Sequence, residues 1–338
     1  MTEKKSFARE NLLVPAASLL FSFAAGALLM LLAGKNPFVI YARLISGTFG
    51  SWYGFGQVLF KATTLMLVGL GLAVSFQAGL FNVGGEGQMY VGGFIGALVG
   101  AQFSAPNPLQ IPLVLAAAFS GGALWAGLAG YLKARFKCHE VITTIMLNFI
   151  AFSVTNWLTS GIFSVPETVH TPQVRTMIPR METFLPFFEN SPLNLTFFLA
   201  LLLLAYFSYW FYRTRAGFEL RVMGANSRAA GYAGVAIEKK IITTLLLSGG
   251  LCGLASANFV LGYKGYFEQG FTGGAGFMGI AVALLGRNKP LGIFFAALLF
   301  GLLNFGGLII NADVPRELVD VIQAVVILSV LAFQEIFK

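Results

Sequence analysis

The chain has 338 residues, of which 57% are hydrophobic and 11% are charged, and its mean hydropathy is +0.78. Soluble domains carry about 25% charged residues, so this composition excludes an ordinary soluble protein and predicts an all-α polytopic membrane protein embedded in lipid. The formal charge of +8 would suit nucleic-acid binding. The basic residues cluster beside apolar segments, however, which predicts topological anchors and no nucleic-acid partner.

Ten apolar segments, all but one of them near the length of a bilayer span, follow one another along the chain. The predicted spans cover 12–33, 60–78, 87–103, 111–132, 141–161, 193–212, 241–262, 275–286, 290–311 and 317–337. The eighth is too short to cross as a regular helix, and Gly273, Gly274 and Gly276 beside it predict a broken or half-length helix. We expect a single transmembrane domain, 1–338, of about ten helices.

Basic residues predict the orientation of these spans, because Lys and Arg are enriched in cytoplasmic loops. With the N-terminus in the cytosol, most of the 22 Lys and Arg residues lie inside. The exceptions are Lys35, Arg43, Lys61, Arg175, Arg180, Lys264 and Arg316. Both termini are therefore expected in the cytosol.

Two loops are long enough to have a shape of their own. Residues 164–192 lie outside in this topology, and their repeated prolines predict an irregular cap. Residues 213–240 lie inside and are amphipathic, with Leu220, Met223 and Ala230 available to pack. Asn226 and the serine after it form a reasonable helix start. A short exposed helix at the cytosolic face predicts a docking element.

A polar, glycine-rich run, Gly79-Leu-Phe-Asn-Val-Gly-Gly-Glu-Gly-Gln-Met89, separates two strongly apolar segments. Glu86 within it falls at the expected depth of the bilayer, where a carboxylate usually faces a cavity or a partner. A second glycine-rich run, 270–278, also leads into an apolar span. In the expected topology the two runs open helices of opposite direction, which predicts an inverted-topology repeat. Glycines that serve only as packing contacts are the alternative.

The sequence holds no motif of an enzyme. The P-loop pattern Gly-x-x-x-x-Gly-Lys-Ser/Thr is absent, no His, Cys and Glu residues have metal-ligand spacing, and no Ser/His/Asp set can be nominated. We therefore expect no catalytic activity, no metal and no cofactor. The scarcity of ionisable groups at membrane depth also disfavours a stand-alone secondary transporter or channel, which is the rival interpretation.

Amide side chains are the main polar groups left within the spans. They can hydrogen-bond a neutral polar solute, or they can join helices to one another. Our candidates for a substrate pathway are Asn82, Glu86, Gln88, Asn148 and Asn258. For Glu86 the alternative is a helix cap satisfied by the amides of its own turn.

Three stretches resemble permease subunits of bacterial ABC importers for nucleosides and simple sugars. The run 79–88 is similar to the family pattern Gly-Leu-Phe-Asn-Ile-Gly-x-Glu-Gly-Gln, with Val83 and Gly85 as mild variants. Residues 140–151 and 214–234 resemble a second family stretch and the family's ATPase-contacting loop. The similarity covers essentially the whole chain, with the stretches in the family's order.

The resemblance implies an importer of two permeases and two ATPases in the bacterial inner membrane, supplied by an external substrate-binding lipoprotein or periplasmic protein. It implies nucleosides, especially purine nucleosides, with ribose or another simple sugar as the alternative. It favours a second permease of a different chain over a second copy of this one. The ATPase-coupling residues would be Gly217, Arg221, Gly224, Asn226, Ala229 and Ala230.

Overall fold

The computed structural model describes residues 17, 20–32, 34–311, 319–325, 328, 329 and 332. In these residues the regular structure is helical, apart from isolated β-bridges that pair His170 with Glu268 and Arg180 with Asn194. The helices are α2 (Pro37–Phe49), α3 (Trp52–Gln77), α4 (Gly85–Gln102), α5 (Asn107–Phe136), α6 (Glu140–Gly161), α7 (Thr196–Arg213), α8 (Arg215–Ala225), α9 (Ser227–Tyr232), α10 (Ile237–Ala255), α11 (Ala257–Phe259), α12 (Ala275–Leu285) and α13 (Pro290–Ile310). Short 3-10 helices cover Met181–Thr183 and Pro186–Phe188, and a π-helical turn covers Val260–Lys264.

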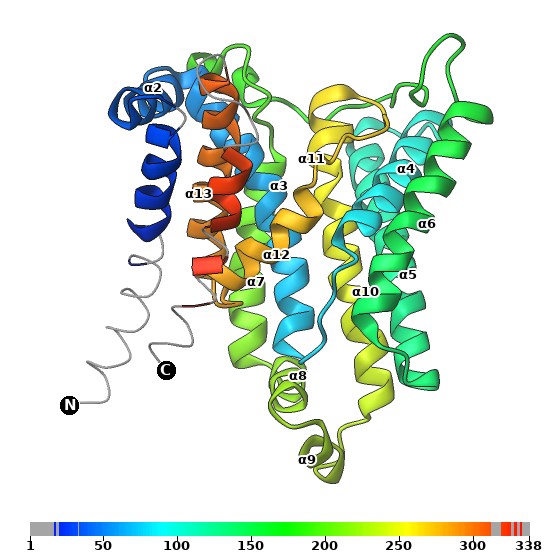
Figure 1. Cartoon of the computed structure of the whole chain (residues 1–338). Helices are drawn as coiled ribbons and strands as arrows, with labels where there is room; N and C mark the ends of the chain where they lie inside the picture. The colour runs from blue at the N-terminus through cyan, green and yellow to red at the C-terminus, as the bar shows by residue number, and fades with distance from the viewer. Residues whose placement is uncertain are drawn as a thin grey trace.

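The helices α3 and α10 form the centre of the bundle, with α2 and α13 on one side and α4, α5 and α6 on the other (Figure 1). In the most apolar 18-residue stretch of Trp52–Gln77 (α3), 89% of the residues are buried. The corresponding share is 83% in Ile237–Lys264, which contains α10, and 22% in Glu140–Gly161 (α6). A helix that is apolar on all sides needs such a buried position or a lipid environment. The outer helices α6 and α7 accordingly turn large apolar side chains outward, including Trp157 and Leu202, as suits a surface covered by lipid.

Glycines bring α10 very close to α5. A Cβ atom on Gly249 would lie 2.4 Å from the carbonyl oxygen of Gly122, and one on Gly253 would lie 2.4 Å from that of Ala118. Membrane helices use small residues in this way so that their backbones approach and gain van der Waals contact. Part of the glycine content therefore serves helix packing.

Among the described residues, six helices are long and apolar enough to cross a membrane, and a seventh crossing arises if the pair Leu20–Leu32 and Pro37–Phe49, bent by 120°, counts as one span. The described residues therefore show fewer full-length crossings than the ten predicted. One reason is that α12 has only 11 residues, and another is that Glu86, Gln88 and Gln102, together with the glycines, lower the hydropathy of α4. Parts of the predicted spans 12–33 and 317–337 lie outside the described residues.

The entry into α3 differs from the span prediction. An additional helix, α2, follows Asn36, whose side chain caps the amide of Phe38. The helix α3 then begins after Ser51, whose hydroxyl accepts a hydrogen bond from Gly54 N at 3.0 Å. The predicted start at residue 60 is wrong. It was placed by hydropathy, whereas the start of the helix is determined by the capping residue Ser51. Lys61, expected at the outer end of a span, lies inside α3.

The two long connections lie at opposite ends of the bundle (Figure 1). The segment 164–192 is irregular, and hydrogen bonds tie it to the turn after the π-helix, from Thr171 N to Phe267 O at 3.0 Å and from Val174 N to Gly265 O at 2.7 Å. The helices α8 and α9 cover the other end. A membrane-spanning protein built in this way presents a different element on each side.

Candidate functional site

Buried amide side chains hold the glycine-rich turn between α3 and α4. Asn82 Nδ2 donates to Ser248 Oγ of α10 at 2.9 Å and to Gln88 Oε1 at 3.1 Å. Asn82 Oδ1 accepts a hydrogen bond from Gly84 N at 2.8 Å. Both amides are almost fully buried, so they need such partners to offset the hydration they have lost.

Asn148 on α6 fixes the same turn. Its Oδ1 accepts from Gly87 N at 2.9 Å and its Nδ2 donates to Val83 O at 3.0 Å. Thr144, one helical turn earlier, accepts a hydrogen bond from Val83 N at 3.2 Å. The structure therefore brings three predicted pathway residues, Asn82, Gln88 and Asn148, to a single turn, where they join helices in this conformation.

Glu86 reaches away from its own helix to the N-terminus of α12. Its Oε2 accepts a hydrogen bond from Gly276 N at 2.6 Å, and its Oε1 accepts one from Thr272 Oγ1. A helix N-terminus carries partial positive charge and N–H groups without intrahelical partners, so it favours a carboxylate. Glu86 is thus a cap, but the helix that it caps is α12 and not its own.

The helices α4 and α12 meet at glycines. A Cβ on Gly276 would lie 2.3 Å from Glu86 N, and one on Gly85 would lie 3.2 Å from Gly276 O. The approach to α12 also requires glycine, since Gly273 and Gly274 have φ values of +56° and +83°. From this crossing α4 and α12 run in opposite directions (Figure 1). The two glycine-rich runs, far apart in the sequence, are neighbours in space.

Substitutions of Glu86 separate a capping role from a pathway role. We expect Glu86→Gln to cost about 1–2 kcal/mol, because it keeps the shape and one acceptor but loses charge-assisted bonding. Glu86→Leu should cost about 3 kcal/mol, since Thr272 Oγ1 and Gly276 N would lose their acceptor. Thermal unfolding in detergent measures both. Loss of uptake in Glu86→Gln with little loss of stability supports a pathway role, whereas uptake that only follows stability argues against one.

Asn258 lies apart from this cluster, on α11, and its side chain bonds to α3. Its Nδ2 donates to Thr64 Oγ1 at 2.8 Å and to Phe60 O at 3.0 Å. Its Oδ1 accepts a hydrogen bond from Asn194 Nδ2 at 3.0 Å. These partners do not include the other predicted pathway residues. Asn258 instead fixes two residues that line a pocket.

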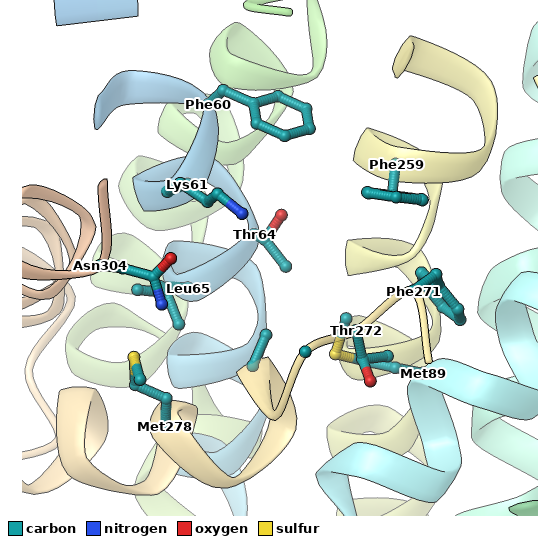
Figure 2. Close-up of a pocket in the computed structure, with 12 residues that line it drawn as sticks. Phe60, Lys61, Thr64, Leu65, Met89, Phe259, Phe271, Thr272, Met278 and Asn304 are labelled. Atoms are coloured by element: carbon teal, nitrogen blue, oxygen red, sulfur yellow. The ribbon is translucent and has the colours of Figure 1, made fainter. Parts of the chain in front are cut away.

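The pocket opens between α3, α13 and the segment that leads from α11 to α12 (Figure 2). Its lining residues are Phe60, Lys61, Thr64, Leu65, Met89, Phe259, Phe271, Thr272, Gly273, Ala275, Met278 and Asn304. None of the predicted pathway residues is among them. They support the pocket from behind, because Glu86 bonds to Thr272 and Asn258 bonds to Thr64.

The pathway candidates predicted from the sequence did not include the polar residues that line the pocket. Asn304 stands out in the sequence as an amide within an apolar span. A signal for Lys61 also existed, because a helix start at Ser51 would have placed this lysine within a span. Thr272 and Thr64 carried no local signal, since threonines are common in membrane helices and loops.

Capping residues start the two short helices of the loop 213–240, and buried side chains pack them on the bundle. The Thr214 hydroxyl accepts from Gly217 N at 3.1 Å to start α8, and Asn226 Oδ1 accepts from the first amides of α9. Leu220, Met223 and Ala230 are buried. The amphipathic pattern of this loop thus packs one face on the bundle and leaves the other exposed.

An ion-pair cluster ties α8 to α10. The Glu219 carboxylate contacts Lys240 Nζ at 2.8 Å and Arg215 Nε at 2.8 Å. Hydrogen bonds from Lys240 and then from Arg215 hold the pKa of Glu219 below its usual value. Arg221 lies over the ring of Tyr212, with its guanidinium carbon 5.2 Å from the ring centroid. The charges of α8 therefore bind mainly to the chain's own helices.

Glycines on α8 allow it to lie directly on the bundle. A Cβ on Gly217 would lie 2.3 Å from Trp210 O of α7, and one on Gly224 would lie 2.1 Å from Gln77 O at the end of α3. A Cβ on Gly79 would lie 3.2 Å from Gly224 Cα. The last turn of α8 thus contacts the first residue of the glycine-rich run that continues to Asn82 and Glu86. Ala229 and Asn226 remain exposed.

These features define a polytopic membrane protein with a glycine-built helix crossing, a pocket beside it and an exposed helical pair at one end. The chain matches the family described as branched-chain amino acid transport system / permease component over residues 54–331, and it belongs to this family of membrane permeases. The resemblance seen in the sequence is thereby confirmed.

The relatives of the chain include several permeases with printed substrates. It is 40% identical to the guanosine ABC transporter permease protein NupP of Bacillus subtilis, over 95% of this chain and 93% of that protein. It is 33% identical to the nucleoside ABC transporter permease protein NupB of Lactococcus lactis, over 94% and 90% of the two chains. It is 32% identical to the glucose ABC transporter permease protein TsgB13 of Haloferax volcanii, over 96% and 88%. No solved structure matches the chain.

Proposed function

We propose that this chain is the permease subunit of an ABC importer and forms the path by which nucleosides, purine nucleosides foremost, cross the membrane. The observation that carries this function is the pocket beside the α4–α12 crossing, whose aromatic and polar lining suits a ring-bearing polar solute. Relatives described as guanosine and nucleoside permeases support the substrate class. A simple sugar is the second candidate, because another relative is described as a glucose permease.

The importer is proposed to contain an ATPase subunit, a second permease and an external substrate-binding protein, in the bacterial inner membrane. The second permease is a different chain in this proposal. Support comes from the descriptions of the relatives as ABC transporter permeases. ATP hydrolysis takes place on the partner chain, since this sequence holds no P-loop motif.

The proposed topology has ten membrane segments with both termini in the cytosol and an inverted repeat. The short α12 and the glycine-rich α4 would be the broken segments at the centre of the two halves. The contact between their N-termini and their opposite directions support this arrangement, because repeats related by a pseudo-two-fold axis meet at that axis. The excess of basic residues in the predicted cytosolic loops supports the orientation.

The helices α8 and α9 are proposed to dock on the ATPase. Their exposed face, with Asn226 and Ala229, would meet the partner, while Gly217, Gly224 and Ala230 would hold the pair on the bundle. Movement of α8 would then act on Gly79 and the turn beyond it, because the two lie in direct contact. The docking surface and the glycine-rich turn form one mechanical unit in this proposal.

Purification and transport together test the proposal. The tagged chain, extracted in mild detergent from its own host, should co-purify with an ATPase and a second permease. The same complex, reconstituted with its binding protein, should take up guanosine in an ATP-dependent manner. A solitary chain that takes up solute on an ion gradient alone would refute the importer and support a stand-alone transporter.

A further inference from the structure

The pocket has one wall of aromatic rings. Phe60 contacts Tyr263 with ring centroids 5.5 Å apart, Tyr263 contacts Phe259 at 5.5 Å, and Phe259 contacts Phe271 at 5.5 Å. The rings therefore form a continuous chain from Phe60 on α3 through the π-helical turn and α11 to the loop before α12. Phe271 also packs on buried Tyr90, which holds its orientation. A wall of fixed rings suits contact with a flat or apolar ring face of a solute.

The opposite wall, called here the polar wall, carries Lys61 and Asn304 among the apolar side chains of Leu65 and Met278. Figure 2 shows Lys61 and Asn304 across the open space from Phe259 and Phe271. The Asn304 amide offers both donors and an acceptor, whereas Lys61 already takes part in an interaction within the protein. Within the described part of the chain, no protein group hydrogen-bonds to Asn304, although it lies on an apolar helix. Its amide is thus available to a polar group of a solute.

The charge of the lining is also informative. Lys61 is the charged member of the lining set, and no carboxylate belongs to that set. Glu86 lies behind Thr272, to which it is hydrogen-bonded. A pocket of this kind offers a cation no carboxylate partner in its lining. It suits a neutral solute with hydroxyl groups and one ring face.

We infer that this pocket binds the solute in passage, with a planar ring against Phe259 and Phe271 and its hydroxyl groups toward Asn304 and Lys61. This inference rests on the proposed function and deepens it. A nucleoside fits both walls, with the base on the aromatic wall and the ribose on the polar wall. Asn304 and Phe259 are the residues that determine specificity in this pocket.

Uptake by the complete reconstituted importer tests the polar wall. The substrates are guanosine and 2′,3′-dideoxyguanosine, which lacks the 2′- and 3′-hydroxyl groups of the ribose and keeps the 5′-hydroxyl. Asn304→Leu should lower guanosine uptake about tenfold through loss of a hydrogen bond, and should change dideoxyguanosine uptake less than about twofold. Asn156→Leu, which removes an amide from α6 outside the pocket, is the matched control and should leave the ratio of the two uptakes unchanged.

The aromatic wall has its own pair of variants. Phe259→Leu should lower guanosine uptake about threefold to tenfold, and Phe259→Tyr should retain it, because only the first removes the ring. Equal effects of Asn304→Leu on both guanosines, or unchanged uptake in Asn304→Leu and Phe259→Leu, would overturn the pocket assignment while the wild-type importer still works.

Failure of the proposed function gives a different result. A wild-type complex with no ATP-driven uptake of guanosine or glucose would overturn the proposed function, and the pocket assignment with it. Uptake of glucose alone, lowered about tenfold by Asn304→Leu and unaffected by Asn156→Leu, would keep the pocket and assign it to a sugar.

Discussion

Gly276→Ala is expected to destabilise the protein by about 2–4 kcal/mol and to abolish uptake. The added Cβ would lie 2.3 Å from Glu86 N and 2.4 Å from Glu86 Cα, and backbone atoms cannot move aside as the tip of a flexible side chain can. Relief requires that α12 shift away from α4. That shift would stretch the 2.6 Å hydrogen bond from Gly276 N to Glu86. Thermal unfolding in detergent and ATP-driven uptake measure the two effects.

Gly161→Ala is the matched control for this substitution. Gly161 ends α6, and a Cβ there would have no heavy atom within 4 Å. The change should alter stability by less than about 1 kcal/mol, because it only adjusts helix propensity. A Gly276→Ala protein as stable and active as Gly161→Ala would show that the α4–α12 crossing yields easily and is not a rigid centre.

Gly224→Ala is expected to uncouple the importer while leaving the rest of the bundle folded. Its Cβ would lie 2.1 Å from Gln77 O, so α8 would be displaced from the end of α3 and from Gly79. Overpacking of this kind costs about 1–3 kcal/mol. We expect uptake to fall about tenfold or more while the ATPase still co-purifies and hydrolyses ATP. Uptake and ATPase rates of the same reconstituted sample distinguish uncoupling from loss of assembly.

Gly231→Ala provides the comparison within the same loop. The nearest atom to a Cβ on Gly231 would be in the side chain of Ile237 at 3.7 Å, an ordinary contact. This variant should transport as the wild type does. If Gly224→Ala also transports normally, the contact between α8 and the glycine-rich run does not transmit movement, and the coupling proposal fails.

The residues that support the pocket could be predicted from the sequence because the pattern that marks them is local. Asn82, Glu86 and Gln88 lie in a polar run between apolar segments, so their unusual setting is visible in a short window. Asn148 was selected as an amide within a span, and it does bond to that run. Asn258 was selected for the same reason but bonds elsewhere, because amide character in a helix says nothing of the direction in which the side chain points.

The pocket was not accessible in this way because it is assembled from distant segments. Lys61 comes from α3, Phe259 and Thr272 from the segment around α11, and Asn304 from α13. Asn304 is unusual within its own apolar span, but nothing local shows that it shares a site with Lys61, Phe259 and Thr272. Only the packing of these helices around a common space gives them a shared function.

The sequence by itself determined the class of protein, the short helix α12 and the helix-forming loop that carries α8 and α9. It could do so because hydropathy, glycines and caps act over a few residues. It did not determine the number of full crossings. Whether a marginally apolar segment such as α4 crosses the membrane depends on the helices packed around it as much as on its own hydropathy. The tertiary structure alone decided that Glu86 caps α12, that Gly224 lies on α3 and that an aromatic and a polar wall face each other. These contacts join residues far apart in the chain. The energies of the contacts therefore depend on the folded arrangement, and no local sequence pattern predicts them.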